Sequence, residues 1–490
     1  MISERLQHAR EFEAEFGGSE AERPAFHVTP TVGWMNDPNG FSVFQGEYHL
    51  FYQYHPYSNA WGPMHWGHVK TRDFIKWERL PAALAPDQSY DQDGCYSGSA
   101  LELPDGKQLL VYTGVCKSTA ADGAVQEAQT QCIAIGDGQN YEKYPMNPVL
   151  DGYDLPTGGH PEDFRDPKIW REPNGSYHLA VANRTGDGSG AVLLFGSQDA
   201  LHWKFLHTLD ASHGEFGGMW ECPDFFRLSE KYVLMLSPQD MFPQGLEFHA
   251  GNNTAWLIGS TEPDVTFSRQ AVQPVDYGID FYAPQTLLAP DGRRIMIGWM
   301  QNWETSGYKV EGRSWFGQMT LPRELWMENG RIFQRPVKEL EAYRRGRMTY
   351  RDVTVQEEIS LAGISGRVLD MTLTLRPTAG AEWFRLSIAK GGNYSATIRC
   401  SLAQGTITLD RSSSGLNRDI LHTRTFPAAM QAGILQLRLV MDRFSAELFV
   451  NGGAQAATMV LYAPAEADGI CFAADRPVMM DVEKYELGGF

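Results

Sequence analysis

The sequence has no apolar segment that approaches the roughly 20 residues needed for a membrane-spanning helix. Its first residues, MISERLQHAREFEAEFGG, carry charges throughout and lack the apolar stretch of a signal peptide. Apolar residues recur there at helical spacing, before a Gly-Gly stop: Ile2, Leu6, Ala9, Phe12 and Phe16. We therefore expect a cytoplasmic protein with no membrane partner, in which residues 1–25 form an N-terminal helical extension.

Cysteine and positive charge are also scarce. The six cysteines show no CxxC or Cys/His spacing, so buried free thiols are predicted in place of disulfides or a metal site. A net charge of -18 argues against nucleic-acid binding, which needs basic patches to neutralise phosphates. Asp87, Asp91 and Asp93 stand before Gly94, but their spacing is wrong for a calcium loop and no closing Glu follows. The sequence predicts no metal and no cofactor, and it leaves neutral or polyol-like substrates open.

What the sequence does contain is a repeat of about 60 residues. Five segments begin with a polar or Gly-led turn and continue as an apolar strand: GEYHLFYQY, GKQLLVYTG, GSYHLAVAN, EKYVLMLSP and GRRIMIGWM. Their starts are 60, 69, 55 and 62 residues apart. A second series of turn aspartates, Asp73, Asp137, Asp199 and Asp264, is spaced by 64, 62 and 65 residues. Two independent markers therefore share one period.

A unit of this length, with several short strands and no long helical pattern, is typical of a propeller blade. Five units fill the chain over about 26–335, which predicts an all-β fold with a five-bladed β-propeller. The alternative is an ordinary pair of β-sandwiches with accidental regularity. Beyond the propeller, RPVKELEAYRRGR predicts a helical linker over 336–350, and alternating segments predict a C-terminal β-sandwich over 351–490.

A polar cluster stands about nine residues before each of the five strands. The clusters are NDPNG, CYSGS, FRDP, WECPD and FYAPQ, which places five residues in equivalent positions: Asp37, Ser97, Asp166, Glu221 and Tyr282. The innermost strands of a propeller surround one channel, so equivalent positions on these strands converge. A lone Asp before Pro is more often a turn-capping residue. Convergence of Asp37, Asp166 and Glu221 favours instead a set of carboxyl groups for work on a glycosidic bond.

The neighbouring residues indicate how these three carboxyl groups divide their roles. Asp37 lies between two asparagines, which favours an ionised nucleophile. Asp166 follows Arg165, whose positive charge favours the carboxylate. Glu221 stands among Trp220, Cys222 and Pro223, and these apolar neighbours favour a protonated acid that serves the leaving oxygen.

The ordered motifs WMNDPNG, YQYHP, YSGS, FRDP, WECPD and DFYAPQ resemble those of glycoside hydrolase family 32, from about residue 26 to residue 335 and more loosely to the end. That family includes invertases, sucrose-6-phosphate hydrolases and fructan hydrolases. The resemblance implies a propeller with a C-terminal β-sandwich and a retaining double displacement on a β-fructofuranosyl unit. It implies that Asp37 is the nucleophile, Glu221 the acid/base and Asp166 the stabiliser of the transition state. Retention would place the Asp37 and Glu221 carboxyls roughly 5–5.5 Å apart.

The resemblance also implies a fructose pocket. Amides, hydroxyls and a guanidinium bind sugar oxygens, and Trp faces cover the C–H surface of the ring. The residues are Asn36, Gln53, Trp61, Tyr96, Ser97, Arg165, Tyr282 and Trp299. Tyr96 stands where the family often has Phe.

The expected substrate is a small fructoside such as sucrose, sucrose 6-phosphate or a short fructo-oligosaccharide. Exo-acting hydrolysis of inulin or levan, fructosyl transfer and a silent sugar-binding protein are the alternatives. Lys309 or Arg313 could contact a phosphate or merely water. The role of the C-terminal domain and the oligomeric state stay open.

Overall fold

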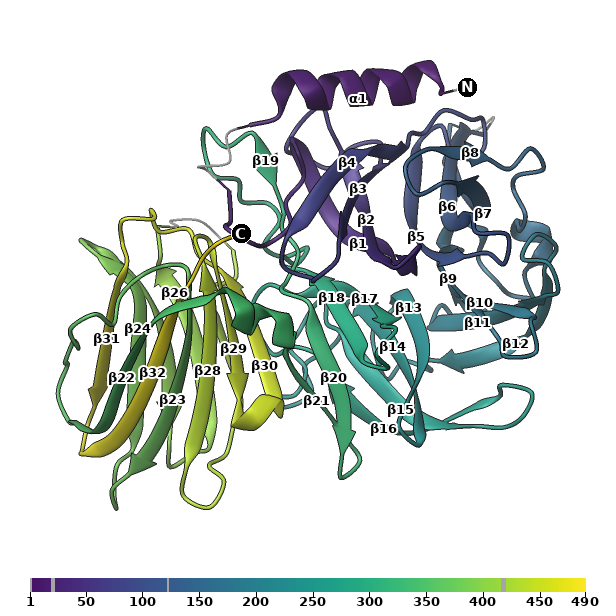
Figure 1. The fold of residues 1–490 in the computed structure, drawn as a ribbon. Coiled ribbons are helices and arrows are strands. Elements are labelled where there is room, and N and C mark those ends of the chain that lie inside the picture. Colours follow the sequence, from purple (N-terminus) through teal and green to yellow (C-terminus); the bar gives the residue numbers. More distant parts are fainter. Residues whose placement is uncertain (1, 19–22, 121–122, 416–419) are drawn as a thin grey trace.

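The protein has two all-β parts that lie side by side (Figure 1). The computed structural model describes residues 2–18, 23–120, 123–415 and 420–490. Five sheets, antiparallel except for the short parallel pair of β1 and β19, form the N-terminal part, and two larger sheets form the C-terminal part. The predicted all-β fold, a five-bladed propeller followed by a β-sandwich, is therefore confirmed.

Each blade is one sheet of consecutive strands, with an extra short strand in the first blade. In chain order the blades contain β1 (Gly33–Phe44), β2 (Glu47–His55), β3 (His65–Thr71) and β4 (Trp77–Leu84); β5 (Gly94–Glu102), β6 (Gln108–Thr119), β7 (Val125–Gly136) and β8 (Tyr141–Lys143); β9 (Arg165–Arg171), β10 (Tyr177–Arg184), β11 (Gly190–Ser197) and β12 (Lys204–Ala211); β13 (Met219–Leu228), β14 (Lys231–Gln239), β15 (Ala255–Thr261) and β16 (Phe267–Pro274); β17 (Tyr282–Leu288), β18 (Arg294–Trp299), β20 (Arg323–Glu328) and β21 (Arg331–Pro336).

The first strand of each blade lies on the inside of the ring. β1 contacts β5, β5 contacts β9, β9 contacts β13, β13 contacts β17, and β17 contacts β1 again. The ring is closed by β19 (Trp315–Phe316), which comes from the fifth blade and pairs in parallel with Gly33 and Trp34 of β1. The polar clusters of the sequence lie on these five inner strands, so residues far apart in sequence become neighbours.

The two periodic markers correspond to fixed places in the blade. The five apolar segments form the second strands, β2, β6, β10, β14 and β18. The aspartates lie in the turn between the third and fourth strands of the first four blades. Asp73 and Asp199 each accept hydrogen bonds from two backbone amides of that turn. The repeat is thus a repeat of turn chemistry as well as of apolar strands.

The N-terminal helix α1 (Glu4–Phe16) begins at Ser3, whose Oγ accepts from the amide of Leu6, and ends at Gly17. It packs on β4 of the first blade. Leu6 and Ala9 are buried, and the buried carboxyl of Glu13 accepts from the amide of Ala82. No helix in the described ranges is long and apolar enough to span a membrane.

The predicted helical linker over 336–350 is wrong in its extent. Only a short 3₁₀ helix, η4 (Lys338–Tyr343), forms there, and β22 already begins at Arg344. Arg344 pairs with Leu487 of the last strand, and its guanidinium bonds Asp370. Pairing with a distant strand has overridden the local helical spacing.

The sandwich consists of a six-stranded and a five-stranded sheet. The first contains β22 (Arg344–Val355), β32 (Val478–Leu487), β23 (Leu369–Pro377), β28 (Leu435–Asp442), β29 (Ser445–Val450) and β30 (Gln455–Val460), and the second β27 (Thr423–Pro427), β26 (Thr406–Ser413), β25 (Tyr394–Ser401), β24 (Trp383–Gly391) and β31 (Gly469–Ala474). Further 3₁₀ turns are η2 (Gly152–Asp154), η3 (Pro161–Asp163) and η5 (Asn451–Gly453).

A buried ionic network joins the two parts. Glu447 of β29 accepts from Arg323 of β20 at 2.9 Å and from the ring of His27 at 2.9 Å. Arg323 also pairs with Asp276 at 2.7 Å, and His27 with Asp442 at 2.8 Å. The side chains of all five are at most 1% exposed. A second buried pair, Arg411 with Asp280, crosses the same boundary.

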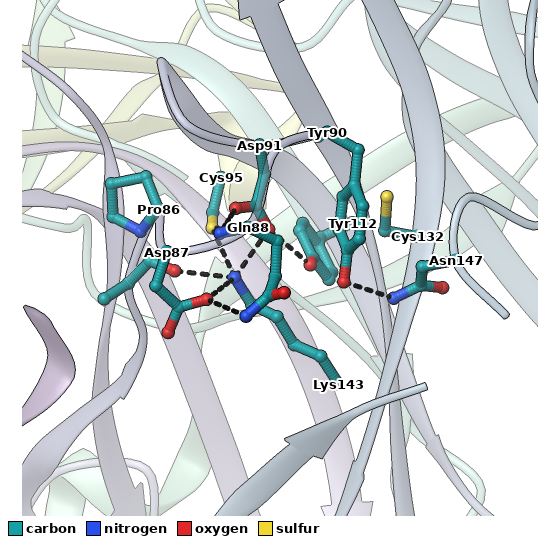
Figure 2. Close-up of polar contacts among 12 residues, drawn as sticks. Pro86, Asp87, Gln88, Tyr90, Asp91, Cys95, Tyr112, Cys132, Lys143 and Asn147 are labelled. Atoms are coloured by element: carbon teal, nitrogen blue, oxygen red, sulfur yellow. Dashed lines mark hydrogen bonds and ion pairs between the residues drawn. The ribbon is translucent and has the colours of Figure 1, made fainter. Parts of the chain in front are cut away.

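Two of the three aspartates that superficially suggest a calcium loop, Asp87 and Asp91, contact an ammonium group instead (Figure 2). Lys143 Nζ lies 2.6 Å from Asp87 and 2.5 Å from Asp91, and Tyr112 donates to Asp91 at 2.8 Å. All six cysteines are free thiols, and only Cys116 among them is not buried, as the spacing predicted.

Candidate active site

A pocket of about 340 Å³ opens at one end of the central channel. Nine of the predicted residues line it, including the three carboxyl groups: Asn36, Asp37, Gln53, Trp61, Tyr96, Ser97, Arg165, Asp166 and Glu221. These residues come from the first four blades. The convergence inferred from the repeat is thus observed.

A bulge in every inner strand turns the functional side chains into the channel. The pairing register shifts after Met35, Tyr96, Arg165, Glu221 and Tyr282 in the five blades. Asp166, Cys222 and Ala283 occupy three of these bulges with φ of 63°, 50° and 50°, a left-handed conformation that is unusual for non-glycine residues. Bulges and strained backbone concentrate beside active sites because they redirect side chains.

The positions of the bulges show that the predicted equivalence of the five residues is wrong by one residue in part of the set. Arg165, Glu221 and Tyr282 are each the last paired residue before a bulge. Cys222, not Glu221, is the counterpart of Asp166. The prediction placed each residue by its distance in sequence from the second strand of its blade. A bulge adds unpaired residues to the inner strand, so this distance does not fix the paired position. Glu221 still lines the pocket, but its position in the strand is equivalent to that of Arg165.

Asp37 and Asp166 lie on either side of one thiol. Cys222 Sγ is 3.6 Å from Asp37 Oδ2 and 3.7 Å from Asp166 Oδ2. Ser97 donates to Asp37 Oδ2 at 2.9 Å, and the amide of Cys222 donates to Asp166 Oδ2 at 2.9 Å. Cys222 of the fourth blade therefore contacts carboxyl groups of both the first and the third blade.

Glu221 is held by polar groups, so the apolar surroundings expected from its sequence neighbours are wrong. Its Oε1 accepts from Arg165 Nη2 at 3.0 Å, and its Oε2 accepts from Gln239 at 2.7 Å and from Tyr282 at 2.8 Å. Trp220 donates its indole N–H to the backbone oxygen of Phe216 instead. Successive strand residues point to opposite faces, so sequence neighbours do not define the environment.

Burial dominates the electrostatics of the two aspartates. Burial, and then the negative charge of Glu221, raises the pKa of Asp37 to about 6, although Asn36 and Ser97 oppose the rise. Burial also raises the pKa of Asp166 to about 7, against the lowering effect of Arg165. Arg165 lies 4.0 Å from Asp166 but makes closer contacts with Glu221 and with Asp163 at 2.8 Å. The predicted preference of Asp166 for the ionised form is thus outweighed by desolvation.

Two predicted pocket residues do not line the pocket. Tyr282 is buried and acts on Glu221 through its hydroxyl. Trp299 is fully buried, because it lies on β18, the second strand of its blade, where it pairs with Tyr282 of the inner strand. Its ring packs against Trp34 and Trp303, and the latter lines the pocket. Trp303 follows β18 in the long connection to β20.

Sequence reasoning missed five lining residues: Glu127, Gln129, Glu162, Asp163 and Trp303. Glu162 and Asp163 lie in η3, directly before the FRDP motif, and this proximity was an available signal. Glu127 and Gln129 lie on β7, and only the tertiary fold brings the third strand of this blade to the rim.

A larger cavity of about 880 Å³ lies at the other end of the channel, near Lys168, Asp224 and Arg294. Lys168 is paired there with Asp224 at 3.0 Å. None of the three predicted catalytic carboxyl groups lines this cavity. We place the candidate active site in the smaller pocket because chemistry, not volume, distinguishes the two.

Family-level sequence models account for nearly the whole chain. The "Glycosyl hydrolases family 32 N-terminal domain" matches residues 27–336, and "Glycosyl hydrolases family 32 C terminal" matches residues 339–485. The chain belongs to glycosyl hydrolase family 32. This confirms the predicted family and makes the protein a glycoside hydrolase.

Individual family 32 proteins resemble this member over most of their length. A sucrose-6-phosphate hydrolase of Zymomonas mobilis is 38% identical over 441 residues, which are 87% of this chain and 84% of that protein. A raffinose invertase of Escherichia coli is 36% identical over 449 residues, with 91% and 90% covered. The solved family 32 β-fructofuranosidase of Bombyx mori is 32% identical with a TM-score of 0.84, and 98% of each chain is covered.

Proposed function

We propose that this family 32 enzyme is a retaining β-fructofuranosidase that releases fructose from sucrose-type substrates. The observation that carries the proposal is the placement of Asp37 and Asp166 around Cys222, with Glu221 lining the same pocket. The resemblance to a Bombyx mori β-fructofuranosidase, of which a variant was solved in complex with sucrose, supports it (32% identical, TM-score 0.84). A cytoplasmic location stays a prediction.

In the proposed reaction Asp37 attacks the anomeric carbon of the fructosyl unit and forms an ester with it. The bond to the leaving oxygen breaks, and Glu221 donates a proton to that oxygen. Water then attacks the same carbon, Glu221 takes up the proton from that water, and fructose leaves with Asp37 restored. Asp166 accepts hydrogen bonds from the sugar hydroxyls and stabilises the transition state. Tyr282 and Gln239 act on the reaction by positioning Glu221.

A comparison of substrates tests this function. We expect fructose to be released from sucrose and short fructo-oligosaccharides, and more slowly from inulin and levan, because a pocket of about 340 Å³ holds little more than a terminal disaccharide. Product analysis by chromatography measures both fructose and fructosyl-transfer products. Absence of fructose from every substrate would overturn the hydrolase proposal, and predominant transfer products at high sucrose would favour the transferase.

The raised pKa values of the two aspartates predict an acid limb in the pH profile. Both carboxylates must be ionised in the proposed reaction, so protonation as the pH falls removes activity. We expect kcat/KM for sucrose to fall with a midpoint near pH 7, set by the higher pKa, that of Asp166 at about 7, and to fall more steeply below about pH 6, where Asp37 is protonated as well.

The variant Ser97→Ala should bring the steep part of this limb to higher pH, since the Ser97 hydrogen bond lowers the pKa of Asp37. A limb near the ordinary carboxyl range, at about pH 4, would contradict the assignment. An unchanged steep part in Ser97→Ala would show that Asp37 does not contribute to the limb.

A further inference from the structure

The active-site pocket is strongly acidic, at its floor and at its rim. Six carboxyl side chains line the pocket: Asp37, Glu127, Glu162, Asp163, Asp166 and Glu221. Among the described residues that line it, Arg165 alone is cationic. The carboxyl groups that the proposed reaction does not use, those of Glu127, Glu162 and Asp163, come from β7 and η3.

The nearby cations are already paired with carboxylates. Arg165 contacts Glu221 at 3.0 Å and Asp163 at 2.8 Å. Arg184 contacts Asp163 at 2.9 Å, and Lys117 contacts Glu127 at 3.1 Å. The side chain of Glu162 is 53% exposed, and its carboxyl group contacts the ring of His160 at 3.2 Å. Even with Lys117 and Arg184 included, carboxylates outnumber cations around the pocket.

The two basic residues singled out in the sequence do not line the pocket. Arg313 turns toward the sandwich, where its guanidinium stacks on Phe444 at 4.1 Å and on Trp315 at 4.5 Å. Lys309 Nζ lies over the ring of Trp34 at 5.7 Å. That ring is 2% exposed and belongs to the wall behind Trp303.

The position of the leaving group follows from the proposed reaction, on which this inference rests. The fructosyl carbon must reach Asp37 and Asp166, which lie at the floor of the pocket. The leaving glucosyl unit then lies at the rim, near Glu127, Glu162 and the half-exposed Trp61. A phosphate on its C6 hydroxyl would bring a charge of about −1.5 to −2 beside these carboxylates.

We propose that the enzyme selects unphosphorylated fructosides, with a neutral sugar at the rim, and discriminates against sucrose 6-phosphate. Like charges at the rim raise the energy of the bound phosphorylated substrate and slow its approach. A neutral glucosyl unit is unaffected by this field, and its hydroxyls can donate to Glu127 and Glu162. The rim carboxylates thus determine specificity without taking part in the chemistry.

The sign of the salt dependence tests this proposal on the unmodified enzyme. We expect kcat/KM for sucrose to exceed that for sucrose 6-phosphate by about tenfold or more at about 20 mM ionic strength. Raising ionic strength to about 300 mM should increase the value for sucrose 6-phosphate, because screening weakens repulsion, and should leave sucrose nearly unchanged. A site that attracts phosphate would give the opposite sign for sucrose 6-phosphate.

Reversing the charge of one rim residue provides a second test of the proposal. Glu162→Lys should raise the ratio of kcat/KM for sucrose 6-phosphate over sucrose about tenfold or more. Glu262→Lys, an equal charge change at the opposite end of the channel, should leave the ratio unchanged. The inference is overturned if the enzyme prefers sucrose 6-phosphate and if kcat/KM for this substrate falls as the ionic strength rises. If Lys309→Met then loses this preference, the phosphate binds at Lys309. Absence of fructose from both substrates would instead overturn the proposed function.

Discussion

Replacing Asp37 with asparagine is expected to lower kcat for sucrose by on the order of 10⁴-fold or more, the size of effect seen when a catalytic nucleophile is removed. The amide has the shape of the carboxyl group but cannot form the fructosyl ester. It can still accept from Ser97, so the pocket should keep its form. Because burial disfavours the charged carboxylate, the neutral side chain should leave the melting temperature equal or higher.

The control for this variant is Glu230→Gln, which changes an exposed carboxyl group between β13 and β14. It should retain full activity. Glu221→Gln separates the two roles when the fructoside carries a leaving group that needs no proton, such as a nitrophenolate. The ester to Asp37 still forms, and azide, which needs no proton removed before it attacks, should restore turnover as fructosyl azide. An active Asp37→Asn enzyme would remove Asp37 as the nucleophile, and absence of azide rescue in Glu221→Gln would remove Glu221 as the base.

Glu447→Gln is expected to lower the free energy of unfolding by about 3–5 kcal/mol, because the buried Arg323 and His27 each lose one of their two carboxylate partners. Glu447 also accepts from the amide of Leu321 and from His27. These three groups belong to the propeller side of the boundary, so the loss should weaken the attachment of the sandwich. Thermal and denaturant unfolding measure the effect.

Glu483→Gln in the same domain is the matched control, since its partner Arg347 is 59% exposed. It should cost at most about 1 kcal/mol. Equal effects of the two substitutions would show that the buried network contributes no more than a surface pair.

The network also carries a pH signature. Burial alone would lower the pKa of His27, but its hydrogen bonds to Asp442 and Glu447 outweigh this effect and raise the pKa to about 9. The stability due to this pairing is complete below the ordinary histidine pKa and is lost as the pH rises through about 9.

The periodic part of the sequence predicted the propeller and most of the pocket. Repeated apolar strands and turn aspartates are local patterns, and a ring of equal units brings equal positions together whatever their separation. Asp37 and Asp166 were located in this way, and so was Ser97. Trp61 and Gln53 came from the resemblance of the motifs and also line the pocket.

The errors came from contacts between blades, which no local pattern describes. The environment of Glu221 is made by Arg165, Gln239 and Tyr282, from three different strands. Trp299 has an aromatic face that could stack on a sugar, but it lies on the second strand of its blade and is covered by Trp303. The linker was assigned from helical spacing alone, while Arg344 pairs with Leu487 at the far end of the chain.

Both parts of the protein join the beginning of their own segment to its end. Gly33 pairs with Trp315 across the propeller, and β22 pairs with β32, the last strand of the chain. During synthesis β1 therefore lacks its parallel partner until β19 has been made, and β22 has no strand partner until β32 has been made. Such long-range pairing slows folding and leaves strand edges open in the meantime. The pairing of β22 with β32 is thus a late step of folding, and chains in which it has not yet formed should be the aggregation-prone species.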